Sequence, residues 1–436
     1  MTMHLVKHIG ATEEGKNNFC ANTLRVGDLN GDGAPDMLFA RSHFETRAIT
    51  GLTALTIEGR RLWQWGCPAE ACGRIYSDLP VQIYDWDGDG RNEVLLVRQA
   101  VYAELHEPKV WHRERAARYE GSATLLILDA ATGQQKDTLP LPAPADDCFL
   151  FADLTGRGRR EDLVVKDRYW NMWGVAHDGR VLWRYQGSTG HFPALADVDG
   201  DGCDEVFVGF ALIDHNGKVL FQHDAGNQHQ DAACAVKTPD GSWHLLFGNG
   251  GLHCLTTDGR ELWKIPLREA QHVVTGHFRG DSSTQVAALN RGEKLPAGGR
   301  APATLCLFDL EGREIWRRVQ PEGSWGAAIT SINWFGPGSP QGILMYSRGY
   351  GEPAVVYNGE GEVADTLALR PVPPQVAPDW ITNIYGPAGY YGLAADIWGD
   401  SRDEAVLYGV SGVYIYANSR PLAIPTIYNE TIYTGM

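Results

Sequence analysis

The most constraining feature of the sequence is an aspartate-rich segment of nine residues that occurs three times between hydrophobic stretches. The copies are "DLNGDGAPD", "DWDGDGRNE" and "DVDGDGCDE", which begin at Asp28, Asp85 and Asp197. Each copy follows a short apolar segment and precedes another, as expected for a loop that joins two β-strands. Recurrence in the same context indicates a repeat fold, in place of the two or three domains that 436 residues alone would favour.

The repeat extends along the whole chain in degenerate form. After each loop come an alternating strand, a third strand, a tight turn and a fourth strand, as in "LIDHNGKVLFQHD", where Asn-Gly suits the positive φ of a hairpin turn. One four-stranded blade cannot cover both of its faces, so the blades must pack around an axis. Eight segments align, anchored at Asp28, Asp85, Asp153, Asp197, Lys237, His277, Asn333 and Asp396.

The predicted fold is therefore all-β, with residues 1–436 forming a single β-propeller domain of eight blades, each of four antiparallel strands. The first repeat has no fourth strand before it, so we expect the N-terminal strand "HLVKHIG" to pair into the last blade and close the ring. Seven blades are the alternative if the segment at Lys237 or Asn333 is not a blade.

The three complete loops predict structural Ca²⁺ sites. Oxygen ligands at alternate positions and an acid at the ninth, with glycines that allow a sharp turn, match the start of an EF-hand loop. The alternative is a set of Asp-Gly turns whose side chains bond their own backbone. The predicted ligands are Asp28, Asn30, Asp32 and Asp36; Asp85, Asp87, Asp89 and Glu93; and Asp197, Asp199, Asp201 and Glu205.

Composition excludes several classes of function. The net charge of −16 argues against nucleic acid, which requires clustered Lys and Arg. No window approaches the ~20 apolar residues of a membrane span, and the N-terminus has no signal-peptide core. The expected location is the cytoplasm, or the exterior if a leader has been removed.

Two insertions between the second and third strands of the first two blades are expected over the mouth of the central channel, where propellers usually bind ligands. Residues 41–51 carry His43 and Arg47, and residues 98–121 carry a basic and aromatic cluster. Arginine binds carboxylates bidentately, rings stack on sugars, and His or Tyr can move protons. An anionic sugar site is the interpretation, with a solvated, charge-balanced loop as the alternative. The candidates in the second insertion are Tyr102, His106, His112 and Arg118.

A second group of candidates precedes the inner strands of later blades. His191 and His229 are expected near the channel mouth, together with Asp78, Asp147 and Asp231, although each histidine alone could be a hydrogen-bonded strand-end residue. Tyr169 and Trp173, in "RYWNMW", could form a stacking platform for sugar or could pack between blades.

The sequence resembles β-propeller polysaccharide lyases of the rhamnogalacturonan lyase type, and the smaller propeller lyases and rhamnosidases that act on rhamnose–glucuronate linkages in ulvan and arabinogalactan. The resemblance rests on "YSDLPVQIYDWDGDGRNEV", "ALADVDGDGCDEVFVGFALIDHNGKVLFQHDAGNQHQDA" and "RPLAIPTIYNETIY", which occur in that order. The Asp-rich loops alone also occur in integrin-like repeats, so the ordered set is the more specific signal.

The resemblance implies cleavage of an anionic polysaccharide by β-elimination next to a uronic acid. Such a lyase needs a group that neutralises the carboxylate, a base and an acid. His43 is the best match to the family histidine, and Tyr102 and Arg118 match the family tyrosine and arginine; Arg47 is a second candidate neutraliser. No second histidine stands at the family position after His43. The possible substitutes are His106, His112 and His191.

The resemblance favours a rhamnose–glucuronate linkage, because rhamnogalacturonan lyases proper carry a region before the first blade that this sequence does not show. Two alternatives remain open: an α-L-rhamnosidase-type hydrolase on the same linkage, and a non-catalytic, calcium-stabilised propeller that binds glycan. His112, Tyr169, Trp173 and His229 are the residues expected to contact substrate.

Overall fold

The computed structural model describes the chain in fifteen stretches, and all structural statements concern these residues. They are residues 3–10, 23–42, 48–66, 79–99, 123–145, 149–167, 170–223, 230–248, 250–292, 301–321, 324, 327–347, 353–369, 390–409 and 412–420. Within them the strands form eight four-stranded antiparallel sheets. The described part of the chain contains no helix long and apolar enough to cross a membrane.

The sheets follow one another along the chain as blades 1 to 8. Blades 1 to 4 comprise β2 (Thr23–Gly27), β3 (Asp36–Ser42), β4 (Ile49–Thr56) and β5 (Arg61–Gly66); β6 (Val81–Tyr84), β7 (Glu93–Gln99), β8 (Ala123–Asp129) and β9 (Gln135–Leu141); β10 (Phe149–Ala152), β11 (Asp162–Lys166), β12 (Asn171–Val175) and β13 (Val181–Gln186); and β14 (Ala194–Ala196), β15 (Glu205–Val208), β16 (Ala211–Ile213) and β17 (Val219–Gln222). Blades 5 to 8 comprise β18 (Ala232–Lys237), β19 (Trp243–Gly248), β20 (Leu252–Leu255) and β21 (Glu261–Ile265); β22 (Ala270–Gly276), β23 (Gln285–Asn290), β24 (Thr304–Asp309) and β25 (Glu314–Val319); β26 (Ala327–Ile332), β27 (Gly342–Ser347), β28 (Ala354–Tyr357) and β29 (Val363–Leu367); and β30 (Tyr390–Ala395), β31 (Glu404–Gly409) and β32 (Gly412–Asn418) with β1 (Met3–Gly10).

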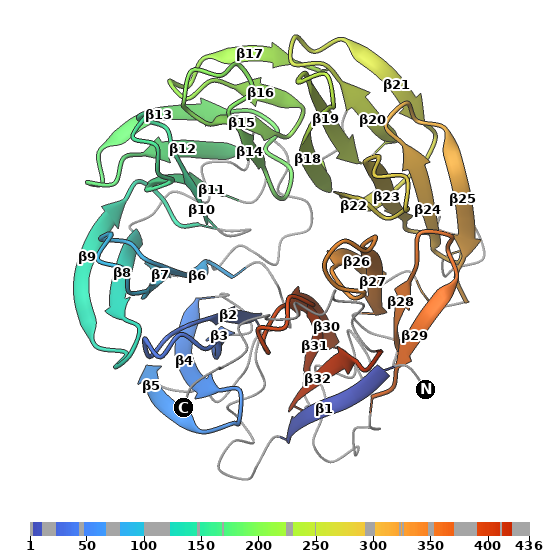
Figure 1. The fold of residues 1–436 in the computed structure, drawn as a ribbon. Coiled ribbons are helices and arrows are strands. Elements are labelled where there is room, and N and C mark those ends of the chain that lie inside the picture. The colour runs from blue at the N-terminus through green and yellow to red at the C-terminus, as the bar shows by residue number, and fades with distance from the viewer. Residues whose placement is uncertain are drawn as a thin grey trace, which may run out of the picture.

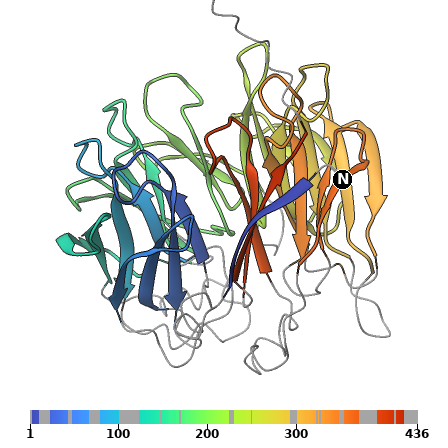
Figure 2. The ribbon, with the colours of Figure 1, turned by 60° about the horizontal axis from the view of Figure 1, so that its bottom comes forward.

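The blades form a closed ring, which confirms the predicted eight-bladed propeller (Figure 1). The first strand of each blade is innermost, and the fourth is outermost. The segments at Lys237 and Asn333 are blades, so the seven-bladed alternative is wrong. β1 pairs antiparallel with β32, from Met3 opposite Asn418 to Gly10 opposite Gly412, so the N-terminal strand closes the ring as predicted (Figures 1 and 2).

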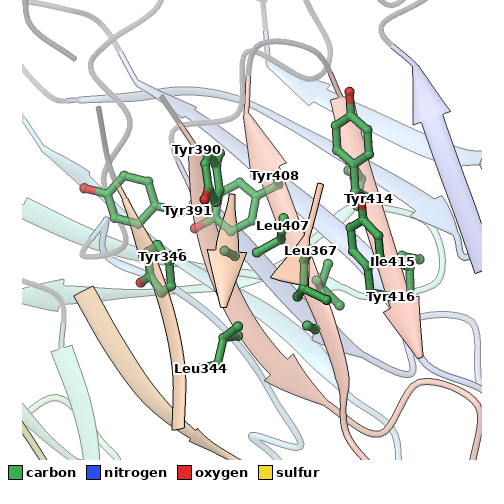
Figure 3. Close-up of a cluster of buried hydrophobic side chains, with 14 of the residues drawn as sticks. Leu344, Tyr346, Leu367, Tyr390, Tyr391, Leu407, Tyr408, Tyr414, Ile415 and Tyr416 are labelled. Carbon is green, nitrogen blue, oxygen red and sulfur yellow. The ribbon is translucent and has the colours of Figure 1, made fainter. Parts of the chain in front are cut away.

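Burial along the strands follows their place in the blade. The second strands β3, β11, β27 and β31 are buried along their whole length, because neighbouring strands and neighbouring blades cover them on all sides. In the outermost strand β5, by contrast, Trp63 is the buried residue and the others are exposed or half-buried. Blades 7 and 8 pack through a tyrosine-rich cluster that includes Tyr346, Tyr390 and Tyr408 (Figure 3).

A tryptophan on the fourth strand joins several pairs of neighbouring blades. Trp63 donates its indole N–H to the carbonyl of Ala130 in the next blade at 2.7 Å, and its ring lies against Gly133 in the hairpin between β8 and β9. The same arrangement joins Trp183 to Gly217. It recurs at Trp263 with Gly312 and at Trp316 with Gly361.

The antiparallel order gives the ring two distinct faces. The loops between first and second strands and the hairpins between third and fourth strands lie on one face, here called the aspartate face. Second strands end on the opposite face, called the insertion face. β3 ends at Ser42 and β4 begins at Ile49, while β7 ends at Gln99 and β8 begins at Ala123, so both insertions follow second strands. A seven-residue strand separates the faces by about 20 Å.

Candidate active site on the insertion face

Most of the catalytic and substrate-binding candidates lie outside the described residues. Their roles, and the position of the two insertions over the channel mouth, stay predictions. These candidates are His43, Arg47, Tyr102, His106, His112, Arg118, Tyr169 and His229. Asp78 and Asp147 lie outside the described residues as well. His191 and Trp173 are described.

His191 lies beside Asp231, where the first strands of blades 4 and 5 begin. Their Nε2 and Oδ1 atoms are 3.7 Å apart; the His191 side chain is 19% exposed and Asp231 is buried. Gln271 donates its side-chain N–H to the same Asp231 oxygen at 2.8 Å. The three residues stand at the starts of blades 4, 5 and 6. An imidazole held near a carboxylate can accept a proton and be stabilised as imidazolium.

The repeat register explains why these three residues meet. His191, Asp231 and Gln271 each stand six residues before the anchor of their blade, at Asp197, Lys237 and His277. Equivalent positions on successive inner strands are neighbours around the channel. Gln271 was not among the predicted site residues, although the alignment of anchors could have found it.

An exposed aromatic side chain follows His191 directly. Phe192 is 38% exposed, whereas Phe149 and Phe207 are buried in clusters between blades. Exposed rings beside a polar group are typical of sugar-binding surfaces, because the apolar face of a pyranose packs on them. Sequence patterns gave no signal for Phe192.

Basic residues gather at the ends of second strands on the insertion face. Arg41 and Arg98 lie near the ends of β3 and β7, Lys166 ends β11, and Arg291 follows β23. Arg98 is exposed, while Arg41 and Lys166 are 1% exposed. Arg291 Nη1 lies 3.7 Å from Glu269 Oε1. An exposed guanidinium such as that of Arg98 can bind a carboxylate bidentately.

Trp173 does not reach the surface. Its side chain is 7% exposed, packs in the apolar cluster between blades 2 and 3, and lies 5.3 Å from the Arg184 guanidinium. This placement favours packing between blades over sugar stacking. Nearby, Asp167 accepts hydrogen bonds from the backbone N–H groups of Trp170 and Asn171, and its burial raises the pKa of the Asp167 carboxyl.

The third Asp-rich loop brings three of its four predicted ligands together on the aspartate face, whereas Asp201 groups with Cys203 and His215. Ligand oxygens of Asp197, Asp199 and Glu205 lie within 4.8 Å of one another. Asp197 also accepts hydrogen bonds from the N–H groups of Gly200 and Gly202, at 2.7 and 3.1 Å, as an Asp-Gly turn would. Burial raises the pKa of Glu205 to about 7, and one of its oxygens has no hydrogen-bond partner among the described residues. Such a set fits a Ca²⁺ ion.

The second loop has the same shape but also contains an ammonium group. Oxygens of Asp85, Asp87 and Glu93 lie within 4.8 Å of one another. Lys136, from β9, lies 2.9 Å from an Asp87 oxygen and 2.7 Å from a Glu93 oxygen. The side-chain hydrogen bonds to Glu93 and Asp87 raise the pKa of Lys136, which keeps it charged. The ammonium competes with any cation for these ligands.

The first loop resembles the third, and no lysine of the described stretches forms an ion pair with its acids. Asp28 accepts hydrogen bonds from Gly31 and Gly33, and the ninth residue, Asp36, accepts one from the N–H of Leu29. Desolvation by burial, together with the charge of Asp32, raises the pKa of Asp36. Because all three loops lie on the aspartate face, cations bound there would be remote from the insertion face and structural in role.

Comparison with known proteins confirms the resemblance to rhamnogalacturonan lyases. The chain is 28% identical over 268 residues to rhamnogalacturonan exolyase YesX of Bacillus subtilis, covering 51% of this chain and 43% of YesX. It is 25% identical over 366 residues to rhamnogalacturonan endolyase YesW of the same organism, covering 73% of this chain and 57% of YesW. The chain thus spans about half the length of the curated relatives it matches. No family model matches.

Solved structures show the same fold. The YesX crystal structure superimposes with a TM-score of 0.62 at 19% identity, covering 96% of this chain and 76% of YesX. The Vibrio cholerae biofilm matrix protein Bap1 superimposes with a TM-score of 0.63 at 14% identity, covering 97% and 92%. The chain is thus an eight-bladed β-propeller whose sequence is similar to those of rhamnogalacturonan lyases.

Proposed function

We propose that the protein is a polysaccharide lyase that cleaves next to a uronic acid, with substrate bound on the insertion face. The observation that carries the proposal is the sequence similarity to two proteins named as rhamnogalacturonan lyases. The His191–Asp231 pair, the exposed Phe192 and the exposed Arg98 support it, because they supply a proton acceptor, an apolar surface and a guanidinium on one face.

In the proposed reaction a base removes the C5 proton of the uronate. Its electron pair forms the C4–C5 double bond, the C4–O bond breaks, and an acid protonates the departing oxygen. Neutral His191 is the proton acceptor, and the Asp231 carboxylate stabilises the imidazolium that forms. Arg118 or Arg47 neutralises the uronate carboxylate, and His43 or Tyr102 is the second proton-transfer group.

The proposed linkage joins rhamnose to glucuronate, and the proposed Ca²⁺ ions stabilise the aspartate face. Rhamnogalacturonan is the second substrate, which the names of the relatives favour.

The test is the rise in ultraviolet absorbance from the unsaturated uronate, with ulvan, gum arabic and rhamnogalacturonan as separate substrates in the presence of Ca²⁺. His191→Ala should lower kcat/KM by about 10²-fold or more. His244→Gln, on the aspartate face, should leave it unchanged. No rise with any of the three substrates would overturn the lyase, and reducing sugar without absorbance would indicate the hydrolase instead.

A further inference from the structure

A cluster of two histidines and a glutamate lies at the seam between blades 4 and 5, apart from the Asp-rich loops. His223 follows β17, the outermost strand of blade 4, while His253 belongs to β20 and Glu261 to β21 of blade 5. One ligand atom from each of the three side chains lies within 4.8 Å of the others. The residues come from two blades, so their approach depends on the packing of blade 4 against blade 5.

The Glu261 carboxylate lies between the two imidazoles. Its Oε2 atom is 2.7 Å from Nδ1 of His253 and 3.7 Å from Nε2 of His223. Ligands of a tetrahedral ion with bonds of 2.0–2.1 Å stand roughly 3.3 Å apart. Small side-chain rotations would therefore bring the three donor atoms around one ion, with the His253–Glu261 hydrogen bond replaced by two bonds to the metal.

Packing fixes the ring orientation of His253 and places His223 beside it. The His253 ring stacks on Phe247, with 4.3 Å between centroids and an interplanar angle of 9°. His223 lies 5.6 Å from the same ring, and its backbone N–H donates to the carbonyl of Phe210 at 2.7 Å. Ligands held in this way lose little side-chain entropy when they bind an ion.

The cluster combines one buried ligand with two that solvent can reach. His253 is 2% exposed. The side chains of His223 and Glu261 are 22% and 35% exposed, which gives an ion access from solvent.

From this geometry we propose that His223, His253 and Glu261 form a Zn²⁺ site that joins blade 4 to blade 5. Two imidazoles and one carboxylate are a typical ligand set for Zn²⁺, whereas Ca²⁺ prefers oxygen ligands alone. Three protein ligands leave one position for water. The site is independent of the proposed lyase activity.

The test is a titration of tag-free, metal-stripped protein with ZnCl₂ by calorimetry, with Ca²⁺ present at saturation to occupy the Asp-rich loops. The wild type should bind one Zn²⁺ and gain thermal stability. His223→Gln and Glu261→Gln should each weaken binding by about tenfold or more, and all the proteins should unfold alike without zinc. His253 is left intact because it is buried.

The matched control is His215→Gln. His215 belongs to a different group, with Asp201 and Asp214 beside the third Asp-rich loop, and this variant should bind Zn²⁺ as the wild type does. Loss of zinc binding in His215→Gln with retention in His223→Gln would overturn the proposal, as would a wild type that binds no Zn²⁺. Co²⁺ gives a second readout, since the visible absorption of a tetrahedral Co²⁺ site should disappear in His223→Gln.

Discussion

The eight blades share the same strand arrangement, and single residues make their loops differ. Blade 2 and blade 4 have loops of the same sequence pattern, yet Lys136 reaches into one and no described lysine or arginine is paired with the equivalent acids of the other. Lys136 stands 43 positions from Glu93, a separation at which no local pattern could have predicted the contact. The sequence therefore predicted equivalent calcium sites where the structure shows different electrostatics.

The first prediction concerns this lysine. Replacing Lys136 by Met should let the second loop bind one additional Ca²⁺ per chain, because the competing ammonium is removed. Without Ca²⁺ the variant should lose about 1–3 kcal/mol of stability, since Glu93 is buried and would lose its partner. Calcium titration against a competing chelator measures the first effect. Lys218→Met, at an exposed hairpin position, is the control, and equal calcium counts in Lys136→Met and wild type would contradict the prediction.

Glu404 gives a prediction about pH. It is 1% exposed and accepts hydrogen bonds from the N–H groups of Ile397 and Trp398, at 2.9 and 3.2 Å. Desolvation by burial, with like charge from Asp400 and Asp396, raises its pKa to about 7. The folded state therefore binds more protons than the unfolded state between about pH 4.5 and 7, and stability falls as pH rises through that window.

Glu404→Gln removes this titration and leaves an oxygen to accept both hydrogen bonds. In the presence of a chelator, the variant should match the wild type near pH 5 and exceed its stability by up to about 3 kcal/mol near pH 8. Urea denaturation at the two pH values measures the difference. If the stability difference between Glu404→Gln and the wild type were the same at pH 5 and pH 8, protonation of Glu404 would make no contribution to the pH dependence of stability.

At the scale of elements, contacts between blades repeat with the register of the sequence. In several blades, a residue just ahead of the second strand forms a hydrogen bond to the backbone of the anchor residue in the preceding blade. Asn92 donates to the carbonyl of Asp28 at 2.8 Å, and Asp403 both accepts from and donates to the backbone of Asn333. Among the described residues, such bonds reach the anchors Asp28, Asp85, Asp153, His277 and Asn333. They give the aspartate face a stabilising role even without metal.

The fold was predictable because strand alternation and the Gly-containing turns are local signals. All eight anchors lie at the junction of first and second strands, and seven of them directly follow the first strand; Lys237 is the last residue of β18. The site was less predictable. His191 and Asp231 meet through the repeat register, but the His223, His253 and Glu261 cluster occupies unlike positions in two blades, so only tertiary structure reveals it.

Alanine substitutions at two glycines, one against a tryptophan ring and one in open space, test how much the Trp–Gly contact between blades stabilises the fold. Gly312 has φ of +80°, and a Cβ there would lie 2.7 Å from the Trp263 ring; Gly241 has φ of +88°, and a Cβ would meet nothing within 4 Å. Both alanine variants should lose ~1–2 kcal/mol of folding stability, because alanine is strained in the left-handed conformation. Gly312→Ala should lose a further ~1–3 kcal/mol by overpacking. Chemical denaturation measures both losses of stability. Equal losses in the two variants would mean that the Trp263 ring can move aside without destabilising the protein.

At the scale of the whole molecule, the closing blade differs from the others because its outermost strand comes from the other end of the chain. Blade 8 thus has no hairpin to receive a tryptophan from β29. Asp365 of β29 instead pairs with Arg420, which follows β32, at 3.1 Å, and accepts a hydrogen bond from the indole of Trp334 at 2.7 Å. A charged contact therefore replaces the Trp–Gly contact at the position where the ring closes.

Ring closure by β1 predicts the effect of removing residues 1–10. Deletion would expose the edge of β32 and remove the stacking of His8 on Tyr414, whose ring centroids are 4.3 Å apart. We expect a loss of at least about 3 kcal/mol, since a full ladder of hydrogen bonds and apolar contacts disappears. A synthetic peptide of residues 1–10 should restore the thermal midpoint in a saturable manner by adding a strand to the open edge, while a scrambled peptide should not. A truncated protein that unfolds at the wild-type temperature and ignores the peptide would show that seven blades and a three-stranded eighth close the ring by themselves.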